Sequence, residues 1–148
     1  MQNIKERCLV RPHEGEALGF LGNEARIKIS ERTSPTGFSL IEFDLPEGCG
    51  APPHQHPWDE WFYILSGGLK MMLDGESLAV GVGDTFHIPA DSLHAFGAIP
   101  GGCRLLQMAT AGQGEAFFRA VTAEAPSMPP DVPKLLAIGD RTQVRFSL

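Results

Sequence analysis

Short apolar runs alternate with turns containing glycine or proline from about residue 36 to residue 110. The run at 60–65 (Glu-Trp-Phe-Tyr-Ile-Leu) is rich in aromatic residues, which favour a pleated sheet. Asp74-Gly75 lies between two such runs and is typical of a two-residue hairpin turn, because both central positions need a positive φ. The pattern predicts strands over 37–45, 60–65, 69–73, 76–80, 85–88, 93–98 and 103–110.

The aromatic run is apolar on both faces. Successive side chains of a strand point to opposite sides, so Trp61, Tyr63 and Leu65 share one face. Phe62 and Ile64 share the other, which can fill the interior of a sandwich or a closed barrel. We expect the first face to be covered as well, by the two terminal zones of the chain and by a second subunit.

The segments that flank this series have a different character. Residues 1–35 form a predicted polar arm with one short strand over 26–30. Residues 111–148 form a tail in which prolines separate two predicted short helices, at 115–121 and at about 131–138. The chain of 148 residues has no internal repeat and no low-complexity tract. We therefore expect one domain, made of an arm (1–35), a β-barrel (36–110) and a helical tail (111–148).

Composition and charge exclude several classes of function. The net charge of −6 disfavours nucleic acid, because affinity for nucleic acid comes largely from Lys and Arg that neutralise phosphates. No apolar run approaches the length of a membrane span, and the N-terminus does not read as a signal peptide. Cys8, Cys49 and Cys103 form no Cys-x-x-Cys pair, which is typical of reduced thiols in a cytoplasmic protein.

The segment 52–60 (Pro-Pro-His-Gln-His-Pro-Trp-Asp-Glu) carries the candidate chemistry. Its prolines favour an extended backbone, on which His54 and His56 face the same side. Glu60 begins the aromatic strand, and His94 begins a later one. If these strands lie side by side, three imidazoles and a carboxylate converge, which are the donors that suit a divalent transition metal. Such a set leaves one or two coordination positions open for water or substrate.

The spacing of these residues resembles that of the cupin superfamily. Every position of the first cupin motif is occupied, by Gly48, His54, His56, Glu60 and Gly67. The second motif is matched at Gly83, Pro89 and His94, while Asp91 and Ala98 replace its glycine and asparagine. Neither replaced residue is a metal ligand in the family. The resemblance covers residues 48–98, and the flanking segments are similar to those of small single-domain bacterial cupins of the quercetin-dioxygenase type.

The resemblance implies both a fold and a function. The fold is all-β, a double-stranded β-helix or jelly-roll barrel with short C-terminal helices. The function is that of a dioxygenase-like oxidoreductase acting on a small molecule, with Fe, Mn, Ni or Zn held by three histidines and one glutamate, in a homodimer. A metal-containing ligand-binding or sensory module without turnover is the alternative. Sugar isomerases also occur among cupins, with Lys70, Arg104 and His87 as the interior candidates here.

Other residues could line a cavity beside the metal. The candidates are Phe62, Ile64, Met71, Phe96, Gln107 and Met108, for which a place in the plain barrel core is an equal alternative. We interpret His87 as a polar strand residue, Cys49 as a small loop residue and Asp59 as a surface residue pointing away from Glu60.

Overall fold

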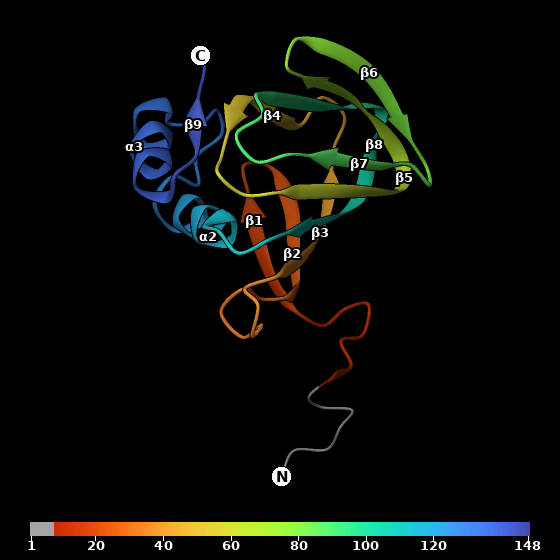
Figure 1. Ribbon diagram of the computed structural model, residues 1–148, viewed down its shortest axis with the longest axis vertical. Helices are drawn as coiled ribbons and strands as arrows, with labels where there is room; N and C mark the ends of the chain where they lie inside the picture. The colour runs from red at the N-terminus through yellow and green to blue at the C-terminus, as the bar shows by residue number, and fades with distance from the viewer. Residues whose placement is uncertain (1–7) are drawn as a thin grey trace.

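The computed structural model describes residues 8–148 as a curled antiparallel sheet with two helices packed at one end (Figure 1). This confirms the prediction of a β-barrel followed by short C-terminal helices. Neither helix is long and apolar enough to cross a membrane. The elements are β1 (Glu16–Phe20), β2 (Asn23–Ile29), β3 (Ser39–Leu45), β4 (Gly50–Gln55), β5 (Glu60–Leu73), β6 (Glu76–Gly81), β7 (Thr85–Ile88), β8 (His94–Ala109), α2 (Gly114–Glu124), α3 (Val132–Thr142) and β9 (Arg145–Phe146).

Strand β8 is the centre of the sheet, because it pairs with three other strands. Its first residues pair with β4, its last residues pair with β3, and β5 runs antiparallel along its other edge. The sheet then continues through β2 and β1 on one side and through β6 and β7 on the other. Phe62, Ile64 and Leu105 fill the enclosed interior, each at most 2% exposed. The prediction that Phe62 and Ile64 face inward is confirmed.

Two predicted turns are in fact irregularities within continuous strands. β5 has 14 residues and β8 has 16, although the sequence predicts a turn in the middle of each, at 66–68 and 100–102. The register shifts on either side of Gly67, which has a φ of +68° and pairs with Cys103. A Cβ at Gly67 would lie 1.9 Å from the carbonyl oxygen of Gly102, so only glycine fits there. The glycines therefore bend β5 and β8 locally and do not divide either of them into two strands.

The predicted arm contributes a hairpin that the sequence analysis missed. β1 and β2 pair antiparallel through a turn at Leu21-Gly22, and β2 continues the sheet beside β3. Both turn residues have a positive φ, of 49° and 80°, as a two-residue hairpin turn requires. Leucine is uncommon in that conformation, so the sequence did not predict a turn at Leu21-Gly22. Leu18 and Phe20 on β1 are buried, which makes this hairpin part of the core.

Helix α2 is attached to the end of β2 by a buried carboxylate. Glu115 accepts hydrogen bonds from the Ser30 hydroxyl (2.7 Å), the Glu31 amide (2.8 Å) and the Arg119 guanidinium (2.8 Å). Burial alone would raise the pKa of Glu115, but the bonds from Ser30 and Arg119 outweigh it and the pKa is lowered. Phe117 and Phe118 then pack edge-to-face on Phe20. The helix is thereby fixed against the β1–β2 hairpin.

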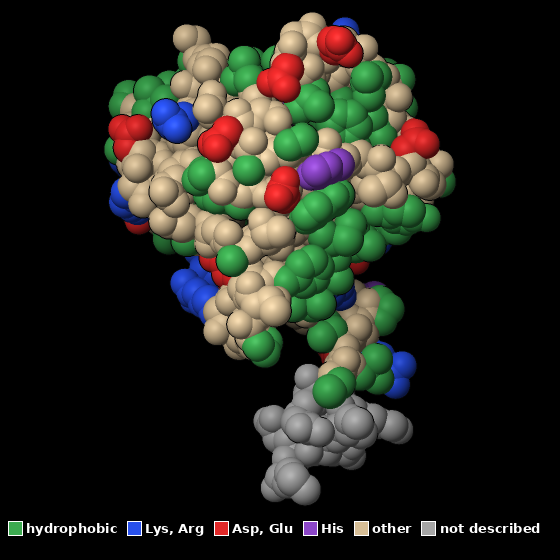
Figure 2. Space-filling view, viewed as in Figure 1, with side chains coloured by type: hydrophobic (Ala, Val, Ile, Leu, Met, Phe, Trp, Pro, Cys, Tyr) green, Lys and Arg blue, Asp and Glu red, His purple; other side chains and the backbone are tan. Residues whose placement is uncertain are grey.

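The terminal segments do not cover the outer face of β5, contrary to expectation. Tyr63 and Leu65 are 39% and 37% exposed, and hydrophobic side chains gather over β5 and β7 on this face of the molecule (Figure 2). The helices pack on the side of β1 instead, where the phenylalanines of α2 meet Phe20.

Candidate metal centre and its cavity

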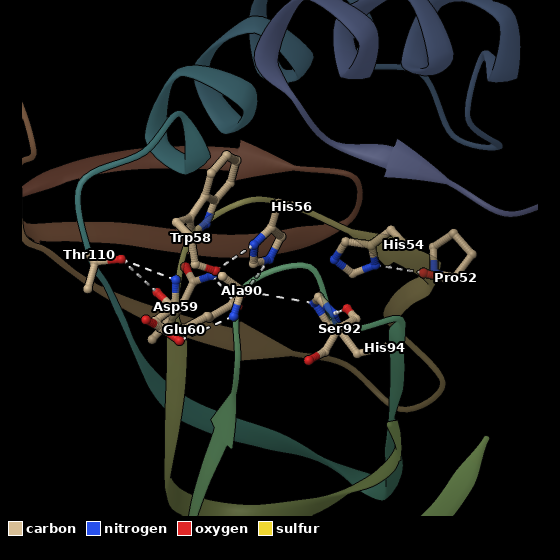
Figure 3. Close-up of polar contacts among 11 residues, drawn as sticks. Pro52, His54, His56, Trp58, Asp59, Glu60, Ala90, Ser92, His94 and Thr110 are labelled. Carbon is tan, nitrogen blue, oxygen red and sulfur yellow. Dashed lines mark hydrogen bonds and ion pairs between the residues drawn. The ribbon is translucent and has the colours of Figure 1, made fainter. Parts of the chain in front are cut away.

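Three imidazoles meet at one end of the barrel (Figure 3). His54 lies on β4 and pairs across the sheet with His94, the first residue of β8, while His56 follows β4 in the loop to β5. One ring nitrogen of each histidine lies within 4.8 Å of those of the other two. All three residues are buried, with 8%, 5% and 0% exposure for His54, His56 and His94. The structure thus brings the sequence-predicted histidines together.

Each imidazole is oriented by a main-chain carbonyl. Nδ1 contacts the carbonyl oxygen two residues away along the chain, at 2.8 Å for His54 and His94 and at 3.1 Å for His56. A carbonyl oxygen only accepts, so each Nδ1 donates and carries the proton. Nε2 of each neutral ring then presents a lone pair, the arrangement found in metal-ligating histidines. Nε2 of His94 is buried and has no hydrogen-bond partner among residues 8–148.

Glu60, the first residue of β5, adds a carboxylate beside two of these rings. Its Oε2 lies 2.7 Å from Nε2 of His56 and 3.8 Å from Nε2 of His94. Its other oxygen, Oε1, accepts a hydrogen bond from the Gln107 amide of β8. A lone pair and a carboxylate oxygen attract each other at 2.7 Å only through a proton or a cation between them. The donor set therefore fits a bound cation.

The ionisation states of the histidines and of Glu60 also favour a bound cation. Burial lowers the pKa of His54 to about 4, assisted by the neighbouring His94, and burial also lowers the pKa of His94. Burial would raise the pKa of Glu60, but its contacts with histidine and with Gln107 outweigh this and the pKa is lowered. At neutral pH, the neutral imidazoles of His54 and His94 therefore lie close to an ionised carboxylate. A buried negative charge of this kind is stabilised by a cation, and imidazole and carboxylate donors suit a divalent transition metal.

A cavity of about 370 Å³ adjoins His54, His56 and Glu60. Of the predicted lining residues, Phe62, Phe96 and Gln107 do line it. Ile64, Met71 and Met108 do not line it, so this part of the prediction is wrong. Ile64 and Met71 are fully buried in the barrel core, and neither lines this cavity. Met108 follows the inward-facing Gln107, so the pleat turns its side chain to the outer face.

The sequence analysis missed two aromatic walls of the site. The Trp58 ring stacks on the His56 ring, with centroids 4.4 Å apart and planes at 8°, and it is 4% exposed. Its position between His56 and Glu60 was a signal that could have identified it. Phe146 on β9 pairs with His54 across the sheet and lies 5.9 Å from that ring. This contact spans 92 positions of the sequence, and no local pattern indicates it.

Other candidate residues lie outside this centre, with one exception. His87 and Asp59 form a pair at 3.1 Å, and His87 stacks on Trp61 at the surface, as expected of a polar strand residue and a surface residue. Lys70 and Arg104 are also exposed. The isomerase alternative required Lys70, Arg104 or His87 inside the barrel, and all three are exposed. Cys49 does line the cavity.

Comparisons with known proteins agree with this geometry. The family model described as "Cupin domain" matches residues 41–106. Quercetin 2,3-dioxygenase of Bacillus subtilis (strain 168) is 27% identical over 109 residues, which is 73% of this chain. The match spans only 32% of that enzyme's length.

Two solved structures share the fold. That of KdgF from Halomonas sp. superposes with a TM-score of 0.63 at 20% identity, over 72% of this chain and 96% of the other. That of the polyketide cyclase RemF from Streptomyces resistomycificus has a TM-score of 0.60 at 28% identity, over 75% of this chain and 80% of the other. The expected jelly-roll arrangement is therefore confirmed.

Proposed function

Because the chain is a small protein of the cupin superfamily, we propose that His54, His56, His94 and Glu60 hold one divalent transition-metal ion. The observation that carries the proposal is the convergence of three buried imidazoles, two of which lie beside the Glu60 carboxylate. Fe, Mn, Ni and Zn all accept such donors, and cellular availability decides among them. Three imidazoles and one carboxylate leave room in the coordination sphere for a small molecule.

We propose that this centre catalyses the dioxygen-dependent oxidation of a small molecule. A bound metal supplies Lewis acidity and, where it is redox-active, a route for electrons to dioxygen. The protein orients the imidazoles through the main chain, fixes the carboxylate through Gln107 and excludes water with Trp58 and the apolar cavity. The similarity to quercetin 2,3-dioxygenase supports this class of reaction.

A binding or sensory module without turnover is the second candidate. Among the residues that line the cavity, the only groups suited to proton transfer near neutral pH are the histidines and Glu60, apart from the thiol of Cys49. An enzyme that needs a separate general base would have to use one of these. A module that only binds a small molecule needs no further group.

Elemental analysis of protein purified without added metal tests the proposal. We expect about one transition-metal ion per chain, as a centre with three or four protein ligands would hold. We then expect dioxygen consumption with at least one member of a panel containing quercetin, a thiol and a diketone. Bound metal together with ligand-induced thermal stabilisation but no product would favour the binding module. Protein that holds no metal, even after reconstitution, would contradict both.

Replacing Gln107 tests how Glu60 is held. In Gln107→Leu the carboxylate loses its amide partner at Oε1 and can rotate away from the histidines. We expect the metal affinity to fall about 10- to 100-fold, as for other residues that orient a ligand. Competition with a metallochromic chelator measures this affinity. The control is Gln113→Leu, whose amide contacts Gln143 away from the centre; equal affinities in the two variants would contradict the role given to Gln107.

We also propose that the protein acts as a homodimer. The exposed Tyr63 and Leu65 on the outer face of β5, together with the stacked Trp61 and His87, support a second subunit there. Sedimentation analysis of the wild-type chain tests it, and a monomer at micromolar concentration would contradict it.

A further inference from the structure

One wall of the cavity contains a buried polar group that has no partner. Asn23, the first residue of β2, is 5% exposed, and its Oδ1 makes no hydrogen bond in the described structure. Asn23 shares the inward face of β2 with Ala25 and Ile27 and lines the same cavity as the histidines. A buried carboxamide without a partner is unfavourable, so native proteins seldom keep one without a purpose.

We propose that the cavity binds an uncharged, largely apolar small molecule that forms a hydrogen bond with Asn23. This inference rests on the proposed function, since it names the class of molecule that the same site would take. Asn23 lies on the β1–β2 hairpin, whereas the histidines lie on β4, β8 and the loop between β4 and β5. The ligand would thus be held from a wall that does not carry the metal ligands.

The local backbone supports a ligand-binding role for this hairpin. Leu21, two residues before Asn23, has a φ of 49°, a conformation that leucine rarely adopts. Its side chain also lines the cavity. An unusual backbone and an unpartnered amide therefore occur together at the tip of one hairpin, and both face the same space. Unfavourable features of this kind concentrate at binding sites.

The remaining lining indicates an uncharged ligand. Among the described residues that line the cavity there is no Lys, Arg or Asp, and Glu60 has the only carboxylate side chain. An anionic group away from the histidines would therefore lose its hydration and find no opposite charge. Aromatic rings supply much of the wall, namely Phe20, Phe43, Phe62, Phe96, Phe117, Phe118, Phe146 and Trp58.

The rim of the cavity is apolar as well. Met128, Val132, Leu136 and Leu148 line the cavity and are also exposed, by 58%, 44%, 40% and 73%. They come from the C-terminal tail, on α3 and on the segments next to it. Exposed apolar side chains that border a cavity are typical of a site for an apolar ligand. The tail therefore both closes the cavity and offers an apolar entrance.

The test uses metal-free protein and the neutral fluorophore N-phenyl-1-naphthylamine, whose emission increases in apolar surroundings. Its displacement is measured with naphthalene, 2-naphthol and 2-naphthoate. In the wild type we expect 2-naphthol to bind about tenfold more tightly than naphthalene, and 2-naphthoate to bind at least tenfold more weakly than 2-naphthol. In Asn23→Leu we expect naphthalene to bind as well as before and the advantage of 2-naphthol to disappear. Asn23→Ala serves as a second variant, and thermal melts check the folding of both.

The outcomes separate this inference from the metal proposal. Equal affinities for naphthalene and 2-naphthol in the wild type, or an unchanged advantage of 2-naphthol in both variants, would overturn the role of Asn23. Tighter binding of 2-naphthoate than of 2-naphthol would overturn the uncharged class of ligand. A fluorophore that fails to bind protein shown to hold its metal would overturn the apolar cavity and leave the metal centre standing. If elemental analysis finds no metal even after reconstitution, the metal proposal fails. The expected displacement pattern in that same protein would still support the inference about Asn23.

Discussion

Simultaneous replacement of His54 and His56 by alanine is expected to reduce the metal content from about one ion per chain to nearly zero. The two substitutions remove two of the three imidazoles whose nitrogens lie within 4.8 Å of one another. His94 and Glu60 alone leave two protein donors, fewer than the three or four that protein sites for such ions use. His56 also provides the closest nitrogen to the Glu60 carboxylate, so that carboxylate loses its main partner.

The barrel should remain folded in this double variant. Both side chains border the cavity, so their truncation enlarges an existing space and leaves the packed interior around Ile64 unchanged. Elemental analysis after gel filtration measures the metal, and circular dichroism with a thermal melt measures the fold. The matched control is His13→Ala with His87→Ala, which removes two exposed imidazoles. Wild-type metal content in the His54/His56 variant, with the control also unchanged, would refute the ligand assignment.

The local part of the site could be predicted from the sequence because it depends on strand geometry. His54 and His56 are two positions apart in an extended, proline-rich segment, and this period places both rings on one side. Glu60 and His94 each begin a strand, and neighbouring strands bring them to the same end of the barrel. The cupin-like spacing predicted this convergence, and in the structure Glu60 Oε2 lies 2.7 Å from Nε2 of His56 and 3.8 Å from Nε2 of His94.

The parts that could not be predicted depend on contacts between distant segments. The glycine-containing segments 66–68 and 100–102 look like turns in the sequence, but the residues on either side of each stay paired with the long partner strand, so each segment is an irregularity within a strand. Gln107 faces inward and Met108 faces outward because successive residues of a strand point to opposite sides. Which of the two faces inward depends on the register of the strand, which the sequence alone does not reveal. Phe146 reaches His54 from the far end of the chain.

The segments outside the cupin-like motifs contribute much of the cavity wall, whereas the three histidines and Glu60 lie within the motifs. The β1–β2 hairpin contributes Asn23, while the tail contributes Phe117, Phe146 and the exposed rim at Leu148. The motifs lie in the barrel, where they supply the histidines and the carboxylate of the proposed metal centre. Features that select a ligand are therefore expected in the flanks, which supply Asn23 and the apolar rim of the cavity.

Acidification is expected to lower the free energy of unfolding of the metal-free protein strongly between pH 7 and pH 4. Burial lowers the pKa of His54 from 6.5 to about 4 in the folded chain. Between these values the unfolded chain binds a proton at this imidazole and the folded chain does not. The contribution is therefore fully present above pH 6.5 and is lost as the pH falls through about 4. A shift of this size corresponds to about 3 kcal/mol.

His94 and Glu60 act in the same direction, because the folded-state pKa of each is also lowered. Urea unfolding of chelator-treated protein at pH 7, 5.5 and 4 measures the loss. The variant His54→Gln removes one titrating group from the buried cluster, so its unfolding free energy should depend less on pH, by about 3 kcal/mol over this range. His13→Gln, in the exposed arm, should keep the wild-type dependence. If His54→Gln and the wild type lose the same stability on acidification, His54 is not buried in its neutral form, and the lone pair that we assign to its Nε2 has no support.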